Sequence, residues 1–227
     1  MIGLPVPSGK IVHRDGVALR TALRELTAEG LVTQLGVTAR DDLLLHGIPA
    51  GQRHAVGPQP LLDLLDPAGD VTALRRLAIA CPALPTCGQA LGEAERVLPD
   101  VVSQLEKVLA DTGNGDAALR LNMTGCPNGC ARPYTAEIGI VGRTKSCYDV
   151  YVGGSASGDR LATRLRANVP LDEIPALLAP VFEHYARRGD GATFGDWSDG
   201  VGTDTIETWL PAPTVRRRRA AVTSEAS

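Results

Sequence analysis

The chain has 227 residues and a formal net charge of −3, and 44% of its residues are hydrophobic and 22% charged. This composition excludes a wholly disordered chain and allows one large domain or two small ones. The negative charge and the aromatic content of only 4% argue against nucleic acid as a partner. No apolar run approaches the ~20 residues of a membrane span. No secretory signal is visible either, so we expect a cytoplasmic protein with no membrane partner.

The first block of the chain, residues 1–66, reads as a small strand–helix–strand unit. A helix is expected over 17–29, because apolar residues recur there at helical spacing and Gly30 follows them. Strands are expected over 10–13, 31–37 and 43–48, with a helical turn or two over 61–65. Together these elements indicate a ferredoxin-like half-domain.

The second block, residues 67–210, alternates strands and helices, which indicates an α+β fold with this block as its α/β domain. Strands are expected over 119–123, 136–141 and 148–152, and helices over 89–110, with a break or restart at Pro99, and over 171–187. After Asp190 the composition turns rich in Gly and Asp, which indicates surface loop. Residues 211–227 read as a disordered basic tail.

Four of the five cysteines form two pairs, each in a loop rich in Gly and Pro: Cys81-x5-Cys87 and Cys126-x3-Cys130. Four thiolates converging from loops are what a [4Fe–4S] cluster needs, and nearby glycines let backbone N–H groups approach the sulfurs. A structural zinc site fits this spacing poorly, but zinc and unligated buried thiols both remain alternatives. Cys147 lies apart and is expected to be a packed free thiol.

Two motifs carry a resemblance to a known family: Ala80-Cys-Pro-Ala-Leu-Pro-Thr-Cys87 and Thr124-Gly-Cys-Pro-Asn-Gly-Cys-Ala-Arg-Pro-Tyr134. They resemble the two signatures of the siroheme and iron–sulfur nitrite/sulfite reductase family. The similarity continues through 136–142, 151–154 and 194–197. Within the family the motifs are most similar to those of the assimilatory sulfite reductase hemoproteins. The nitrite reductases usually carry Ser where Gly129 stands.

The resemblance implies roles for particular residues. Cys81, Cys87, Cys126 and Cys130 would bind a [4Fe–4S] cluster, and Cys130 would also bridge to the siroheme iron as its axial thiolate. Asn128 would lie against the junction of the two cofactors. Cys130 is therefore the expected catalytic residue.

The resemblance also implies an activity, the six-electron reduction of sulfite to sulfide in sulfur assimilation. The electrons would come from ferredoxin or from a flavoprotein reductase. Two alternatives stay open: a ferredoxin-dependent nitrite reductase of the same family, and a non-catalytic [4Fe–4S] electron-transfer module.

Anionic carboxylates of siroheme and anionic sulfite both require cationic side chains around them. The candidates beside the motifs are Arg75, Arg76, Arg120, Arg132, Arg143 and Lys145. The four histidines, His13, His46, His54 and His184, show no metal-ligand spacing. They are expected to be surface or satisfied side chains.

The sequence departs from the family in two respects. The family's chains hold two related halves, and this sequence matches only the second. We therefore expect a fragment lacking the N-terminal half that supplies sulfite-binding Arg and Lys residues, with a separate partner chain or lost catalysis as alternatives. Secondly, Asp41 and Asp42 stand where the family commonly has Gln-Asn. They would disfavour a nearby anionic cofactor if they faced it, but paired Asp residues in a turn usually face water.

Overall fold

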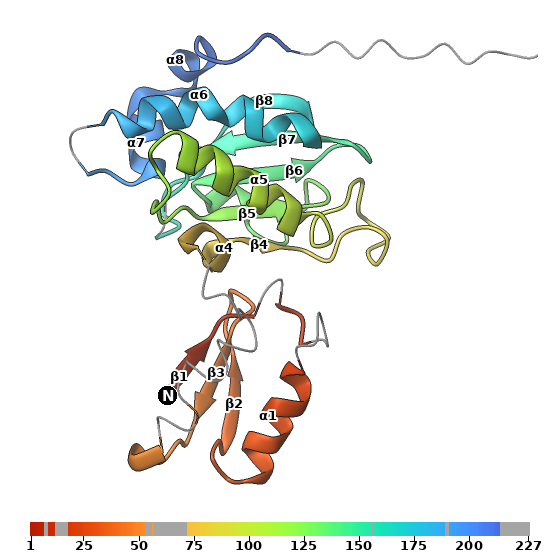
Figure 1. The fold of residues 1–227 in the computed structure, drawn as a ribbon. Helices are drawn as coiled ribbons and strands as arrows, with labels where there is room; N and C mark the ends of the chain where they lie inside the picture. The colour runs from red at the N-terminus through yellow and green to blue at the C-terminus, as the bar shows by residue number, and fades with distance from the viewer. Residues whose placement is uncertain are drawn as a thin grey trace, which may run out of the picture.

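The structure is a computed structural model. It describes residues 1–6, 9–11, 18–52, 56, 72–155, 157–188 and 191–213. Two sheets with separate hydrophobic cores divide these residues (Figure 1). We call residues 1–56 the small lobe and residues 72–213 the large domain. The boundary expected near residue 66 lies outside the described residues.

The small lobe is a three-stranded antiparallel sheet with one helix. The strands lie in the order β1 (Ile2–Leu4), β3 (Leu43–His46), β2 (Gln34–Val37), and the helix is α1 (Leu19–Ala28). Residues alternate across β3, so Leu43 and Leu45 are buried and pack with Leu19 and Leu23 of α1. The expected helix and the two strands of the hairpin are present, with shorter bounds.

The first expected strand is not where the pattern placed it. Lys10 and Ile11 are not in a strand, and residues 12–13 lie outside the described part, as does the expected turn at 61–65. The central strand β3 pairs instead with β1, at the very start of the chain. Three residues are too few for the alternation of a strand to be visible in sequence.

The large domain contains a five-stranded sheet in the order β4-β5-β6-β7-β8. Its strands are β4 (Ile79–Ala80), β5 (Leu121–Thr124), β6 (Ile138–Gly142), β7 (Cys147–Val152) and β8 (Thr163–Pro170). Its helices are α4 (Ala73–Leu77), α5 (Leu98–Asp111), α6 (Ile174–Ala186), α7 (Phe194–Val201) and α8 (Thr203–Glu207). The strands β4, β5 and β6 are parallel, and β7 and β8 continue the sheet antiparallel. The mixed α+β class is thus confirmed.

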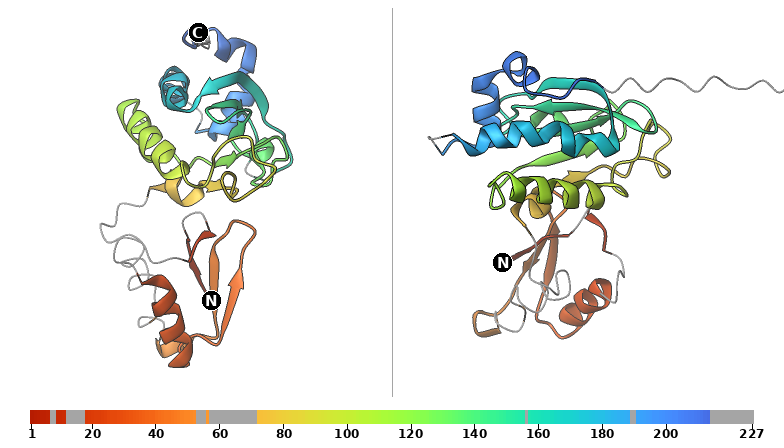
Figure 2. Two further views of the ribbon diagram at one scale, coloured as in Figure 1. Left: turned by 90° about the vertical axis from the view of Figure 1, so that its right-hand side faces the viewer. Right: turned by 45° about the horizontal axis from the view of Figure 1, so that its top comes forward.

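Helices α5 and α6 lie side by side over one face of this sheet (Figure 2). Five apolar side chains of α5 are buried: Leu98, Val101, Val102, Leu105 and Leu109. All five residues of β6, the central strand of the sheet, are buried too, so this strand lies in the core of the domain. Each large apolar side chain buried here contributes roughly 1.5–3 kcal/mol to folding.

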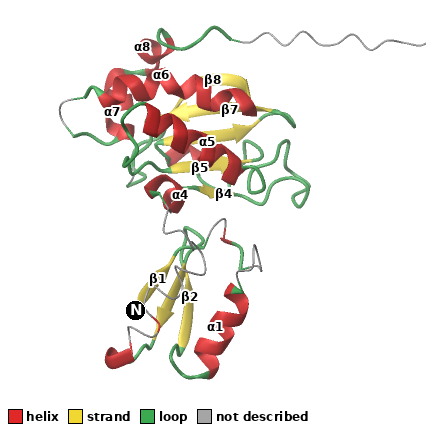
Figure 3. Cartoon of the chain, viewed as in Figure 1, coloured by secondary structure: helices red, strands yellow, loops and turns green. Residues whose placement is uncertain are grey.

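The large domain differs from the expectations in three places. Residues 89–97 form loop rather than helix, and the restart expected at Pro99 is where α5 begins, with Pro99 in its first turn, where it costs no hydrogen bond. The segment after 190 is not all loop, because α7 and α8 lie in it and bury Phe194 and Ile206 (Figure 3). Strand β8 was missed because its outward face is polar, with Arg164 and Arg166 exposed or partly exposed.

Within the described residues no helix is both long and apolar enough to span a bilayer. Residues 211–213 carry no regular structure, and 214–227, with the basic run of the expected tail, lie outside the described part.

Candidate functional site

The two cysteine loops leave the sheet next to each other. Cys81 directly follows β4, and Cys126 comes two residues after β5. These strands are parallel neighbours, with Ala80 opposite Met123, so their carboxyl ends meet at one edge of the sheet. The Cys81 N–H donates to the Met123 carbonyl at 3.1 Å, which continues the pairing up to the first cysteine.

The two loops interlock through backbone contacts at Gly125. Its carbonyl accepts from the N–H groups of Leu91 (2.8 Å) and Gly92 (2.9 Å). A Cβ at position 125 would lie 2.6 Å from both the Ala83 Cβ and the Gly92 carbonyl oxygen, closer than non-bonded atoms come. Glycine is therefore required here by close approach, and it fixes one cysteine loop against the other.

Cys126 and Cys130 lie close enough to Cys81 to affect the pKa of its thiol. The Gly125 N–H donates to the Cys81 sulfur at 3.4 Å, and the Ala83 N–H also bonds it. Burial raises the pKa of Cys81, these two amide bonds oppose the rise, and the nearby Cys130 and Cys126 add to it. Backbone amides aimed at sulfur are a feature of iron–sulfur ligation, so the residues present fit a cluster.

The cysteines do not form a mononuclear metal site. Among the residues that the structure describes, no group of three or more His, Cys, Asp or Glu side chains could hold a single ion. Zinc, with Zn–S bonds of about 2.3 Å, would need the sulfurs to meet around one point. A cluster of four irons and four sulfides is larger and needs its thiols further apart.

Burial changes abruptly within the second cysteine loop, between Cys126 and the residues that follow it. Cys126 is buried, Gly129 is partly buried, and Asn128 and Cys130 are exposed, while Cys81 and Cys87 are half-buried. The loop turns back at Gly129, whose φ is +69° and whose added Cβ would lie 2.8 Å from the Tyr134 ring. The second half of this loop therefore exposes Asn128 and Cys130 at the surface of the chain.

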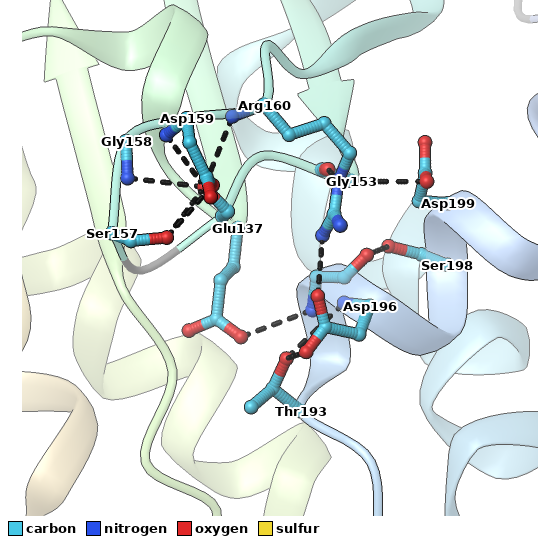
Figure 4. Close-up of polar contacts among 12 residues, drawn as sticks. Glu137, Gly153, Ser157, Gly158, Asp159, Arg160, Thr193, Asp196, Ser198 and Asp199 are labelled. Carbon is cyan, nitrogen blue, oxygen red and sulfur yellow. Dashed lines mark hydrogen bonds and ion pairs between the residues drawn. The ribbon is translucent and has the colours of Figure 1, made fainter.

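A second polar network holds the far side of the large domain together (Figure 4). The buried Glu137 carboxylate accepts from the Gly195 N–H (3.0 Å), at the start of α7, and from the Arg120 N–H (3.0 Å), just before β5. A Cβ at Gly195 would lie 2.1 Å from the Gly154 carbonyl oxygen. The carboxylate thus joins two segments that resemble family motifs, 136–142 and 194–197, to the chain just before β5.

The loop after β7 belongs to the same network. The Ser155 hydroxyl accepts from three successive N–H groups, those of residues 158–160, at 3.0–3.1 Å. Arg160 donates to the Gly153 carbonyl (2.7 Å) and to Asp196 (2.7 Å) and pairs with Asp199 (Figure 4). These contacts fix the loop onto α7 and are structural.

The candidate cations separate into two groups. Arg75 pairs with Glu106 through two nitrogens and joins α4 to α5, and Arg143 pairs with the buried Asp149. Both are thus committed within the domain. Arg132 instead donates to the Ala39 carbonyl in the small lobe. It lies near Arg120 and near Arg40, a residue that sequence reasoning missed.

The paired aspartates of the small lobe take separate roles. Asp41 is exposed in a left-handed conformation (φ +66°). Asp42 is half-buried and accepts from the Val6 N–H at 3.3 Å, and burial raises its pKa. The Asp41 carboxylate faces water, as expected for a turn. The Asp42 carboxylate instead holds the backbone at Val6, just after β1.

The remaining candidates do not join the site. His46 lies in β3, and His184 stacks on Trp209 with ring centroids 3.8 Å apart, while His13 and His54 lie outside the described residues. Cys147 is half-buried at the start of β7, with its sulfur 3.9 Å from the Ser146 hydroxyl. The roles expected of the individual residues Cys81, Cys87, Cys126, Cys130 and Asn128 stay predictions.

The mixed sheet and the paired cysteine loops at one of its edges define an iron–sulfur domain. A family model described as "Nitrite and sulphite reductase 4Fe-4S domain" matches residues 73–211. The chain belongs to this family, as the motifs predicted. The expected [4Fe–4S] cofactor agrees with that description.

Relatives and a solved structure extend the similarity to the small lobe. The sulfite reductase [NADPH] hemoprotein beta-component of Myxococcus xanthus is 42% identical over 95% of this chain. The sulfite reductase [ferredoxin] of Synechococcus elongatus is 36% identical over 90% of it. The Mycobacterium tuberculosis NirA protein superposes with a TM-score of 0.71 at 25% identity, over 90% of this chain and 39% of that one. The chain spans 37% and 33% of the lengths of the two sulfite reductases.

Proposed function

We propose that this chain is the cofactor-binding part of a sulfite reductase. In it Cys81, Cys87, Cys126 and Cys130 would hold a [4Fe–4S] cluster, and Cys130 would also hold the siroheme. The observation that supports this most is the change from the buried Cys126 to the exposed Cys130 and Asn128 within one loop. A sulfur shared between an enclosed cluster and a large macrocycle needs such an outward position.

The reaction is the reduction of sulfite, in which SO₃²⁻, six electrons and six protons give S²⁻ and three water molecules. The two cofactors supply electron storage and the metal that binds the substrate. The chain's own residues hold the cluster by thiolates and direct the amides of Ala83 and Gly125 at the Cys81 sulfur. Hydrogen bonds of this kind tune the reduction potential of a cluster.

The electrons come from ferredoxin or from a flavoprotein reductase, and the names of the relatives give ferredoxin and NADPH as electron sources. Because those relatives are much longer than this chain, the remaining part of a complete reductase would supply further groups around sulfite. We expect these to be arginines and lysines, since sulfite is a dianion.

Gly129 favours sulfite over the nitrite alternative. Its φ of +69° is strained for a residue with a side chain, and an added Cβ would lie 2.8 Å from the Tyr134 ring, so the Ser that the nitrite reductases usually carry would require that ring to shift. A side chain there would move the turn that presents Cys130.

The test is cofactor analysis of the purified chain and two cysteine variants. The wild-type protein should contain iron, acid-labile sulfide and a tetrapyrrole. In Cys130→Ser the haem spectrum should change first, since the shared sulfur is replaced by an oxygen. The matched control Cys147→Ser removes a cysteine apart from the loops and should keep both cofactors. Zinc in place of labile sulfide, or a Cys130→Ser spectrum identical to that of the wild type, would refute the proposal.

A further inference from the structure

The exposed half of the second cysteine loop rests on the side chain of Tyr134. The Tyr134 hydroxyl donates to the Pro127 carbonyl at 2.9 Å. Its ring lies against the turn at Gly129, because a Cβ added there would be 2.8 Å from Tyr134 Cε2 and 3.2 Å from Tyr134 Cδ2. One side chain therefore contacts the loop at two points, on either side of Asn128.

The other hydrogen bonds of this half of the loop are local. The Gly129 N–H donates to the Cys126 carbonyl at 3.4 Å, and the Arg132 N–H donates to the Gly129 carbonyl at 2.8 Å. Among the described residues, only the Tyr134 hydroxyl reaches residues 127–130 from outside residues 126–132. The turn that carries Cys130 thus depends on one contact for its attachment to the rest of the domain.

Tyr134 itself is fixed to the sheet. It lies in a short 3-10 helix, η3 (Pro133–Thr135), and its carbonyl accepts from the Ala162 N–H at 2.7 Å. The preceding Pro133 carbonyl lies so close to β6 that a Cβ added at Gly139 would be 2.2 Å from its oxygen. The backbone around Tyr134 is therefore held on both sides, so its side chain offers the loop a fixed support.

A second aromatic ring fixes the orientation of the Tyr134 side chain. Tyr151 of β7 meets it edge to face, with ring centroids 5.2 Å apart and an angle of 84° between the ring planes. This geometry is favourable for aromatic pairs. The sheet thus determines where the Tyr134 phenol points, and the phenol determines where the loop lies.

We propose that Tyr134 is a positioning residue that preorganises the loop carrying Cys130. The inference rests on the proposed function, in which Cys130 would hold both cofactors. A ligand loop that is already ordered loses less conformational entropy when its sulfur is engaged, so the cofactors are held more tightly. The phenol acts through the loop and does not itself touch a cofactor.

The first test follows hydrogen exchange by mass spectrometry on the full chain as purified, and it does not require a bound cofactor. Tyr134→Phe keeps the ring but loses the hydrogen bond, so the amides of Gly129 and Arg132 should exchange about fivefold faster. Tyr134→Leu loses the aromatic ring as well and should exchange faster still. Tyr151→Phe is the matched control, because it removes a neighbouring phenol that donates no hydrogen bond to the loop among the described residues. Unchanged protection of β6 shows that each variant is folded.

The second test separates positioning from a merely structural role. At equal iron content, Tyr134→Phe should release iron to a chelator roughly threefold faster than the wild type. Its reduction potential should also shift, since the sulfur and amide groups of the loop set that potential. Tyr151→Phe should match the wild type in both measurements.

Two results would overturn the proposal. One is equal loop exchange in Tyr134→Phe and the wild type, or an equal increase in Tyr151→Phe. The other is a reduction potential in Tyr134→Phe identical to that of the wild type. A wild-type chain without acid-labile sulfide would instead refute the proposed function, and the exchange rates alone would then decide whether Tyr134 holds the loop.

Discussion

The large domain and the small lobe contribute to the site in different ways. The large domain carries all the cysteines, in two loops that follow adjacent strands, so its chemistry is visible in short stretches of sequence. The small lobe has no cysteine, yet among the described residues polar contacts join it to segments near these loops: Lys10 with Glu95, Arg40 with the Leu77 carbonyl, and Arg132 with the Ala39 carbonyl. The proposed ligands of a cofactor are thus encoded locally, whereas the surface around them depends on long-range contacts.

The largest effect is expected from Gly125→Ala, where the two cysteine loops interlock. The added methyl group would overlap Ala83 and the Gly92 carbonyl, both 2.6 Å away, and should cost about 3 kcal/mol of unfolding free energy. Denaturant unfolding and labile-sulfide content measure the effect. Gly88→Ala, in the neighbouring loop with no atom within 4 Å, should be nearly neutral. Equal stability of the two variants would show that the loops are not interlocked.

A smaller effect is expected from Glu137→Gln, which tests the polar network that joins the start of α7 to the chain before β5. The amide nitrogen cannot accept a hydrogen bond, so either the Gly195 or the Arg120 N–H is left unpaired in a buried place. We expect a loss of about 2 kcal/mol in denaturant unfolding. Glu183→Gln, on the exposed side of α6, is the control and should change stability little. A loss of similar size in the control would contradict the role of Glu137.

Alkaline pH should weaken the large domain through Tyr148. Burial raises the pKa of this fully buried phenol from 10 to about 12, and its hydroxyl donates to the Glu93 carbonyl at 2.8 Å. Above pH 10 the unfolded chain loses this proton first, so stability falls as pH rises toward 12. The expected loss is about 1.4 kcal/mol by pH 11. Unfolding at pH 9 and pH 11 measures it, and Tyr148→Phe should lack this part of the pH dependence. An unchanged slope in that variant would show that the phenol titrates normally.

The smallest effect is expected at the contact between the lobes. Lys10 is about half exposed, so Lys10→Met should cost less than about 1 kcal/mol in global stability. It leaves the buried Glu95 without its ion pair, and the Glu95 N–H remains bonded to the Cys81 carbonyl. Limited proteolysis should show faster cleavage between the lobes, with the large domain intact. Lys107→Met, on the exposed face of α5, is the control and should be cleaved at the wild-type rate.

The contrast between local motifs and long-range contacts also explains what could be predicted from the sequence. The cysteine loops, β6, β7 and α6 were predictable, because Gly, Pro and apolar runs act locally. Helix α7 was missed because Gly195 and Asp196 interrupt its apolar pattern, although Thr193 caps it and Phe194 is buried in the core. Arg40 was missed because its significance arises only where its turn meets Leu77, across a long sequence separation. No pattern among neighbouring residues predicts such a contact.

X-ray absorption at the iron edge, recorded on the purified chain, tests most directly whether the cysteine loops hold a cluster. We expect a first shell dominated by sulfur and a second shell of iron at short Fe···Fe distance, the latter present only in a multinuclear cluster. Both shells should disappear together in Cys126→Ser, whose sulfur is the most buried of the four. Iron surrounded by nitrogen or oxygen without an iron shell, or a chain that holds only zinc, would contradict the assignment of these four cysteines.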